Sequence, residues 1–252
     1  MSGGALSRRL PWHQGPWAHV SQQMTAGRFP HALLLCGVPG LGKTVFARAL
    51  AQRLLCEAVT ADEACGHCRA CALNAAGNHP DLLICALEEG KRQLGVQTIR
   101  SITTFLALKS QYRRAQVAVV NGAELMSRAA ANALLKTLEE PPDNGFLLLV
   151  SDRPSRLPAT VRSRCQRLVF RVPDEDQALE WLAEQGGADP GRASALLRLA
   201  GGAPGRVLAL AEMDYDGLVT GLGQVLADIA AGRRSVSDVV ERWQTQRERL
   251  PE

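Results

Sequence analysis

The sequence predicts an α/β fold: a mostly parallel sheet with helices on both faces, followed by a smaller helical region. Short apolar runs alternate with helical patterns through the first two thirds of the chain. A glycine-rich loop joins the first of these runs to a helix, and the strand signal disappears after Pro173. Alternating strands and helices are typical of parallel sheets that are buried on both faces.

Five apolar runs have the length and composition of buried strands. They are Ala32–Cys36, Leu82–Ala86, Val117–Val120, Phe146–Val150 and Leu168–Phe170. Helical patterns lie between them at Lys43–Leu55, Gly95–Leu108 and Ser127–Glu140. In the last of these, Ser127 is a plausible N-cap, and Pro141 ends the helix because proline cannot continue its hydrogen-bond ladder.

The pattern changes near residue 172, where we place a domain boundary. Residues 1–172 form the α/β domain, and residues 173–211 form short helices that glycine and proline interrupt. Residues 212–252 are also helical in pattern but contain no obvious closing element. We therefore expect the beginning of a third, helical domain there.

Composition excludes few functions. Of 252 residues, 46% are hydrophobic and 21% charged, and the net charge of +4 permits contact with nucleic acid without arguing for it. The N-terminus lacks the apolar run of a signal peptide, and no apolar stretch is long enough to span a membrane. We expect a cytoplasmic protein with reduced cysteines, in which clustered thiols indicate metal.

A phosphate-binding motif runs from Gly37 to Thr44, with the sequence GVPGLGKT. It follows a predicted strand and opens a predicted helix, which is the context the motif requires. Backbone N–H groups of the loop would approach phosphate oxygens at three glycines: Gly37, Gly40 and Gly42. Lys43 would neutralise the terminal phosphates, and Thr44 would hold magnesium. The sequence thus predicts binding of ATP or ADP with Mg²⁺; the alternative is a glycine-rich turn without a ligand.

The acidic partner of this motif is missing. Nucleotide hydrolases of this class end a second strand with an Asp-Glu pair, which organises the metal and polarises water. Here the strand Val117–Val120 continues into Asn121 and Gly122, and Glu124 is displaced along the chain. General-base effects alone are worth roughly 100- to 10,000-fold. The sequence predicts a chain that binds a nucleotide and hydrolyses it poorly.

Four cysteines form a cluster with the pattern C-x8-C-x2-C-x2-C: Cys56, Cys65, Cys68 and Cys71. Four thiolates around tetrahedral zinc make a common structural site. His67 and His79 are possible substitutes for one ligand, and a set of free thiols is the other alternative. We expect a structural zinc module, 56–71, inserted between a helix and the next strand.

These motifs resemble the clamp-loader branch of the AAA+ superfamily. The resemblance rests on His31-Ala-Leu-Leu-Leu, the Cys65–Cys71 string CGHCRAC, the Asn132–Pro142 string NALLKTLEEPP, and Ser163-Arg164-Cys165. It spans residues 31 to about 170 in the expected order. It implies an AAA+ core, then a helical lid at residues 173–211 and the start of a helical collar domain at residues 212–252.

Two clamp-loader subunit types share these features, the gamma/tau motor and the delta-prime subunit. Asn121-Gly122 and the N-terminal Pro11-Trp12 and Pro16-Trp17 look more like delta-prime, with an ATP-hydrolysing gamma/tau-type motor as the alternative. A zinc module that reads nucleic acid directly is a weaker third hypothesis, because residues 61–80 contain one arginine and no lysine.

The resemblance implies a role in DNA replication, as a subunit of the DNA polymerase III holoenzyme with little ATPase activity of its own. The implied partners are the gamma/tau motor and delta subunits, and through the ring the sliding clamp and primed DNA; no membrane is implied. It also implies that Arg164 reaches the nucleotide site of a neighbouring motor as an arginine finger. A structural ion pair or a basic patch with Arg162 and Arg167 is the alternative. Arg206 matches a lid arginine of the motors, displaced by one position.

Overall fold

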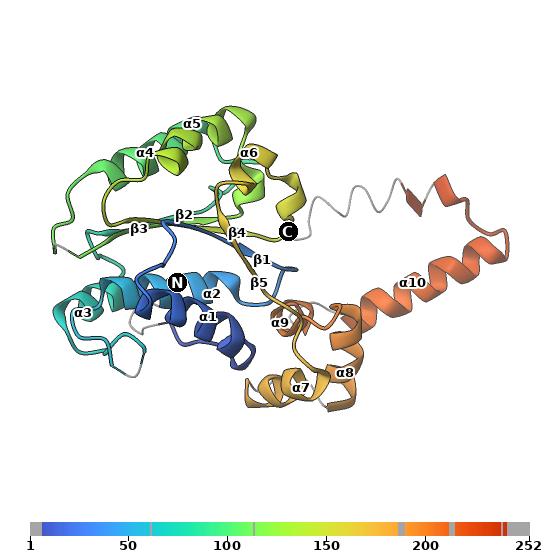
Figure 1. The fold of residues 1–252 in the computed structure, drawn as a ribbon. Coiled ribbons are helices and arrows are strands. Elements are labelled where there is room, and N and C mark those ends of the chain that lie inside the picture. The colour runs from blue at the N-terminus through green and yellow to red at the C-terminus, as the bar shows by residue number, and fades with distance from the viewer. Residues whose placement is uncertain are drawn as a thin grey trace.

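The computed structural model describes residues 7–60, 62–112, 114–185, 190–211, 215–237 and 239–240. Its centre is a five-stranded parallel sheet in the order β2-β3-β4-β1-β5 (Figure 1). The strands are β1 (Ala32–Cys36), β2 (Leu82–Cys85), β3 (Gln116–Asn121), β4 (Gly145–Ser151) and β5 (Gln166–Val169). The predicted parallel α/β fold is confirmed.

Helices cover both faces of the sheet (Figure 1). One face carries α1 (Gln14–Thr25) and α2 (Lys43–Leu55), with α3 (Arg69–Ala75) beside them. The other carries α4 (Val96–Ala107), α5 (Arg128–Glu139) and the short α6 (Ala159–Arg162). Single turns of 3-10 helix are η1 (Pro11–His13), η2 (Ala123–Leu125) and η3 (Pro154–Arg156).

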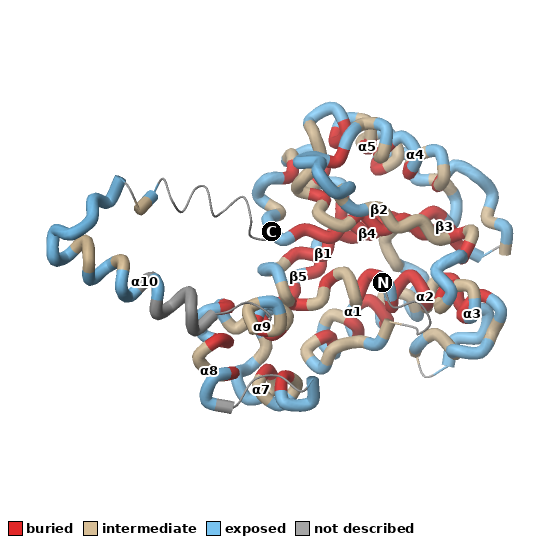
Figure 2. Tube along the Cα trace, turned by 180° about the vertical axis from the view of Figure 1, so that it is seen from behind, coloured by how far each residue is buried: buried red, intermediate tan, exposed pale blue. Residues whose placement is uncertain are grey.

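The sheet separates two apolar clusters because successive strand residues point to opposite faces. In β1, Leu33 and Leu35 pack with Phe46 of α2, whereas Leu34 packs with Ile99 of α4 and its neighbours. The central strands β1, β3 and β4 are buried at almost every residue, as their red colour in Figure 2 shows, whereas the edge strands β2 and β5 are partly exposed. A strand buried on both faces has to be apolar at every position, and this explains the continuous apolar runs in the sequence.

The predicted strands lie within one or two residues of the observed ones. The largest shift is at β5, which begins at Gln166 instead of Leu168. β5 is an edge strand, paired with β1 alone, so its polar Gln166 and Arg167 remain at the surface and hide the strand start from an apolar pattern. Ser127 caps α5 as predicted, since its hydroxyl accepts a bond from Ala130 N–H at 3.2 Å.

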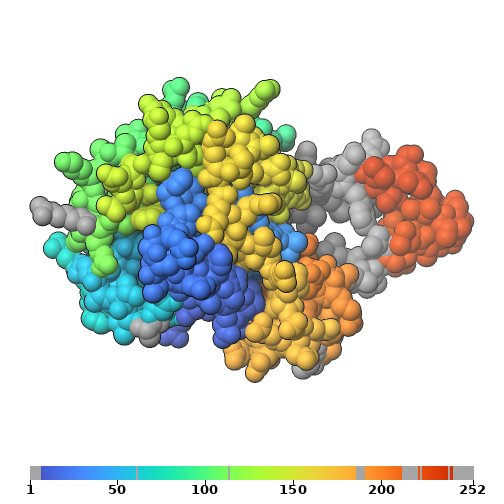
Figure 3. Space-filling model, in the orientation of Figure 1, coloured from blue at the N-terminus to red at the C-terminus, as the bar shows by residue number. Residues whose placement is uncertain are grey.

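Three helices follow the sheet domain and pack around a small cluster of their own. They are α7 (Glu175–Glu184), α8 (Pro190–Leu199) and α9 (Pro204–Ala211). The cluster includes Ala178, Leu182, Leu196, Leu197 and Val207. α10 (Tyr215–Ala230) stands apart from both packed regions in Figures 1 and 3. None of the helices described is long and apolar enough to cross a membrane.

Candidate nucleotide site and thiol cluster

The phosphate-binding loop lies where the sequence placed it, between β1 and α2. Gly40 and Gly42 have φ angles of 84° and 72°, in the left-handed region that favours glycine. Gly37 approaches the carbonyl oxygen of Phe170 so closely that a Cβ would lie 2.8 Å from it. Leu41, between the glycines, is fully buried. The loop therefore depends on glycine at these positions for its backbone conformation and its packing.

The two polar side chains that follow the loop point to different partners. The Lys43 ammonium donates to the Val38 carbonyl oxygen at 2.6 Å and forms an ion pair with Asp152 Oδ1 at 2.6 Å. The Thr44 hydroxyl donates to Asn121 Oδ1 at 3.0 Å. The lysine side chain is only 3% exposed, so its charge is balanced inside the protein.

The carboxyl end of β3 supplies an amide where a hydrolase has its metal-binding acid. Asn121 is the last residue of β3, and it accepts the Thr44 hydroxyl bond. It therefore lies beside the phosphate loop, at the position where the metal-binding acid would be. Gly122 follows with a φ of 69°. Glu124, which looks displaced in the sequence, is turned back by η2, and its Oε1 accepts a bond from Asp152 N–H at 3.0 Å.

Asp152 is the site residue that the sequence reading missed. It comes directly after β4, and β4 lies between β1 and β3. Carboxyl ends of adjacent parallel strands meet at one edge of the sheet, where ligands of such folds bind. That position was the available signal, although only the register of β4 against β1 reveals that Asp152 reaches Lys43.

The segment before α1, which includes Trp12 and His13, packs against the phosphate loop. Trp12 Nε1 donates to the Leu41 carbonyl oxygen at 2.9 Å, and His13 Nε2 lies 2.9 Å from the same oxygen. His13 Nδ1 accepts from Leu10 N–H, so Nε2 carries the proton and donates to Leu41. Trp12 also contacts Trp181 of α7 edge-on, with ring centroids 5.2 Å apart. This segment thus connects the phosphate loop to the helical region of α7, α8 and α9.

Burial lowers the pKa of His13 to about 4, with a further lowering by nearby Arg9, against the opposing bond to Leu41. The unfolded chain then binds more protons below pH 6.5, so folding stability falls as pH drops from about 6.5 towards 4. We expect about 2 kcal/mol less stability at pH 5 than at pH 7.5 from this residue. Urea unfolding of His13→Gln should show that much less pH dependence, whereas His19→Gln, at an exposed histidine, should keep the wild-type slope.

The helical region of α7, α8 and α9 contacts the phosphate loop through α9. Gly205 N–H donates to the Gly40 carbonyl oxygen at 2.9 Å. A Cβ on Gly40 would lie 2.7 Å from the backbone nitrogen of Arg206, and one on Gly205 would lie 2.6 Å from the Gly40 oxygen. Arg206, which the family resemblance matches to a lid arginine, thus packs its backbone and first side-chain carbons on Gly40.

The four predicted cysteine ligands come together. Their Sγ atoms all lie within 4.8 Å of one another, and three of the pairs are 3.8 to 4.0 Å apart. A tetrahedron of thiolates with Zn–S bonds of about 2.3 Å has edges of about 3.8 Å. The residues present therefore fit a four-coordinate metal. Backbone N–H donation from His67 lowers the pKa of Cys65 to about 7, which favours the thiolate.

Neither histidine alternative joins this group. His67 is exposed, and its Nδ1 lies 2.9 Å from the Cys65 carbonyl oxygen. His79 is buried, and its Nδ1 accepts from Asp81 N–H at 3.1 Å. Among the described residues, the compact metal-binding group consists of the four cysteines.

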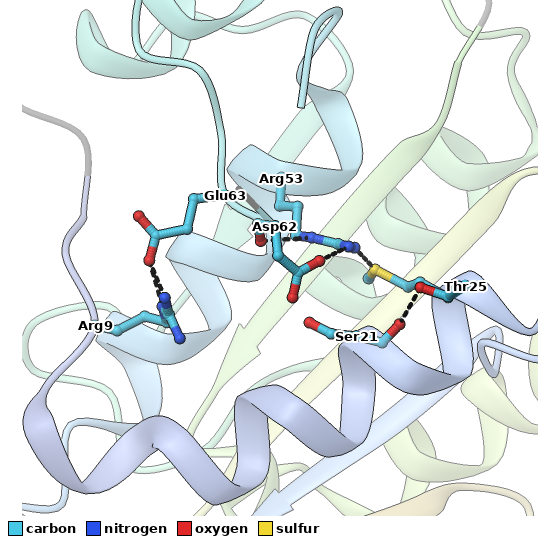
Figure 4. A network of polar contacts seen from close by, with 7 residues as sticks. Arg9, Ser21, Thr25, Arg53, Asp62 and Glu63 are labelled. Atoms are coloured by element: carbon cyan, nitrogen blue, oxygen red, sulfur yellow. Dashed lines mark hydrogen bonds and ion pairs between the residues drawn. The ribbon is translucent and has the colours of Figure 1, made fainter. Parts of the chain in front are cut away.

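Two arginines fasten the loop before Cys65 to the sheet domain, as Figure 4 shows. Arg53 of α2 pairs with Asp62 and contacts the Met24 sulfur, and Arg9 pairs with Glu63. The Arg9 guanidinium also lies over the Trp17 ring, 4.5 Å from its centroid. The thiol cluster is thus anchored to the same N-terminal segment that contacts the phosphate loop.

Arg164 lies far from this chain's own loop. It precedes β5, at the amino edge of the sheet, whereas the loop follows β1 at the carboxyl edge. Its guanidinium pairs with Glu139 Oε1 at 2.6 Å and donates to the Thr160 carbonyl oxygen at 3.0 Å. The side chain remains 36% exposed, so the ion pair predicted as the alternative exists at the surface.

Comparison with known proteins identifies the family. The family described as "DNA polymerase III, delta subunit" matches residues 12–174, more than half of the chain. "DNA polymerase III subunit delta', AAA+ ATPase lid domain" matches residues 173–211. The chain is 41% identical over 207 residues to DNA polymerase III subunit delta' of Escherichia coli K12, covering 82% of this chain and 62% of that protein.

A tau/gamma relative is less similar. DNA polymerase III subunit tau/gamma of Haemophilus influenzae is 32% identical over 213 residues, covering 84% of this chain and 30% of that protein. The fold resembles the branch migration motor RuvB of Thermotoga maritima with a TM-score of 0.50 and 16% identity, covering 85% of this chain and 67% of that one. This chain belongs to the family of DNA polymerase III delta' subunits, with an AAA+ fold.

Proposed function

We propose that this chain is a non-motor subunit of the sliding-clamp loader in DNA replication and that it acts in the cytoplasm. The observation that carries the proposal is an intact phosphate loop whose Thr44 faces Asn121 where a motor has an acid. The greater identity to delta' than to tau/gamma supports the same assignment. The chain spans about 62% of the length of the E. coli relative, so the partners belong to the proposal too.

The proposed partners are the gamma/tau motor and delta subunits, with the clamp and primed DNA reached through the assembled ring. A pull-down with tagged chain should retain motor and delta subunits in preference to primed DNA alone. Retention of primed DNA without any other subunit would favour the nucleic-acid-reading zinc module instead.

The nucleotide role of the site follows from its own residues. Backbone N–H groups of the Gly37–Gly42 loop and the α2 N-terminus would hold phosphate oxygens of ATP or ADP, and Lys43 would pair with them. Bound Mg²⁺ would supply charge neutralisation at the phosphates. Thr44 would be a ligand for it, while the Asn121 amide adds an oxygen but no charge.

The isolated chain is expected to hydrolyse ATP at least about 100-fold more slowly than a motor subunit, since Asn121 and Gly122 provide neither a charged metal ligand nor a base. Steady-state phosphate release measures this. Any residual turnover should be the same in Lys43→Ala, which identifies it as contamination. Robust turnover that Lys43→Ala abolishes would favour the gamma/tau-type motor.

We propose that Cys56, Cys65, Cys68 and Cys71 hold a structural zinc ion. The proposal is supported by their spacing, which matches the edges of a zinc–thiolate tetrahedron. Four protein ligands fill the coordination sphere, so the ion would stabilise the segment around α3 instead of activating water.

We propose further that Arg164 serves the nucleotide site of a neighbouring motor. Its place at the amino edge of the sheet keeps it from its own loop, and the Ser163-Arg164-Cys165 string fits the family resemblance. A surface ion pair such as Arg164–Glu139 is worth about 0 to 1 kcal/mol, so the guanidinium can exchange this partner for a phosphate.

A further inference from the structure

The ammonium of Lys43 is already neutralised by the protein. Its side chain is 97% buried, and its Nζ atom lies 2.6 Å from both Asp152 Oδ1 and the Val38 carbonyl oxygen. In phosphate loops of this type, the lysine reaches the β- and γ-phosphates. A carboxylate therefore stands at a position where this lysine would otherwise meet a phosphate oxygen.

The fold holds Asp152 at that position. β4 lies between β1, which leads into the loop, and β3, which ends at Asn121. Asp152 directly follows β4, so it lies between the end of β1, where the loop begins, and the end of β3, where Asn121 contacts Thr44. Thr44 is the residue that would bind Mg²⁺. Its backbone N–H donates to Glu124 Oε1 at 3.0 Å, which fixes the backbone and brings a second carboxylate beside the first.

We propose that Asp152 takes the place of the terminal phosphate, so that this site prefers a nucleoside diphosphate to a triphosphate. The inference rests on the nucleotide binding proposed above and adds the phosphate class. A β-phosphate can use the N–H groups at the start of α2 and share Lys43 while the Asp152 ion pair stays intact. A γ-phosphate must displace Asp152 from Lys43 or lie beside two carboxylates.

The size of the preference follows from like-charge repulsion. A unit charge about 4 Å from another weakens binding by about fivefold at the dielectric constant of water, and by more in a partly buried site. Asp152 is 42% exposed, so solvent screens part of this effect. With Glu124 as a second charge, we expect ADP to bind at least about tenfold more tightly than ATP.

The test is calorimetric titration of the full chain with ADP and with ATP, each with Mg²⁺, in wild type and Asp152→Asn. We expect the variant to bind ATP about tenfold more tightly than wild type does, with a much smaller change for ADP. Asp143→Asn is the matched control, because it removes the same charge at an exposed position just before the amino end of the same strand. It should leave both affinities unchanged.

Three outcomes would overturn the inference. The first is wild-type protein that binds ATP as tightly as ADP, or more tightly. The second is an ATP affinity of Asp152→Asn equal to that of Asp143→Asn. The third is the absence of nucleotide binding from both wild type and Asp152→Asn. Co-purification of the same proteins with motor and delta subunits is scored separately. If the chain co-purifies with these subunits but shows no preference for the diphosphate, only the role of Asp152 is refuted. If wild type does not co-purify with them, the clamp-loader function is refuted.

Discussion

Replacing Arg164 with alanine in an assembled clamp loader is expected to slow ATP hydrolysis at the adjacent motor site by about 1,000-fold or more, the range found for arginine fingers. A planar guanidinium stabilises charge on the transferring phosphoryl group, and alanine offers no substitute. Single-turnover hydrolysis with clamp and primed DNA present is the measurement, because steady-state turnover would be diluted by other active sites in the ring.

In the isolated chain, Arg164→Ala should have little effect on stability. Arg164 gives up a surface ion pair with Glu139 and a bond to Thr160, so unfolding free energy should fall by less than about 1 kcal/mol. Assembly and zinc content should stay normal. Arg162→Ala is the control on the neighbouring helix α6. If that variant slowed hydrolysis and Arg164→Ala did not, the finger would be the wrong arginine.

Loss of one thiol from the cysteine cluster should have the second largest effect. Zinc binding to small structural sites is worth about 10 to 16 kcal/mol, so each of four ligands accounts for about 3 kcal/mol, or about 100-fold in affinity. Cys68→Ser should therefore lower the zinc content from about one per chain after dialysis against a weak chelator. Hydrogen exchange around α3 should rise because the ion that ties its N-cap residue to Cys56 and Cys65 would be lost, even though a serine hydroxyl can still accept the bond from Cys71 N–H.

The control for the thiol is Cys85→Ser on β2, where the cysteine is half-buried and outside the cluster. It removes a thiol without touching the proposed site, so its zinc content should equal that of wild type. Nucleotide affinity should be unchanged in Cys68→Ser. Wild-type protein that contains no zinc after purification under reducing conditions would contradict the proposal outright.

The parts of the molecule that were predictable from sequence are those encoded locally. The strand before the phosphate loop, the glycines of the loop and the N-cap at Ser127 each depend on neighbours a few residues away. Helix α1 was missed, although Trp17, Val20 and Met24 are spaced for one face, because its polar residues dilute that stripe.

Contacts between distant segments were not predictable in the same way. Asp152 reaches Lys43 only because β4 pairs with β1, and no local pattern near either residue specifies that pairing. The bonds from Trp12 and His13 to the Leu41 oxygen likewise depend on how the N-terminal segment crosses the loop. The motif identified the phosphate site, whereas its charge balance required the three-dimensional arrangement.

The left-handed turn at Gly122 restricts how this chain could evolve into a hydrolase. A motor needs a carboxylate at that position, yet Gly122 has a φ of 69°, where side-chain-bearing residues are strained by about 1 to 2 kcal/mol. A Cβ there would also lie 3.1 Å from Leu125 Cδ1. Gly122→Glu alone would thus cost stability before any catalytic gain, and position 121 would still lack an acid, so acquiring hydrolysis requires more than one substitution.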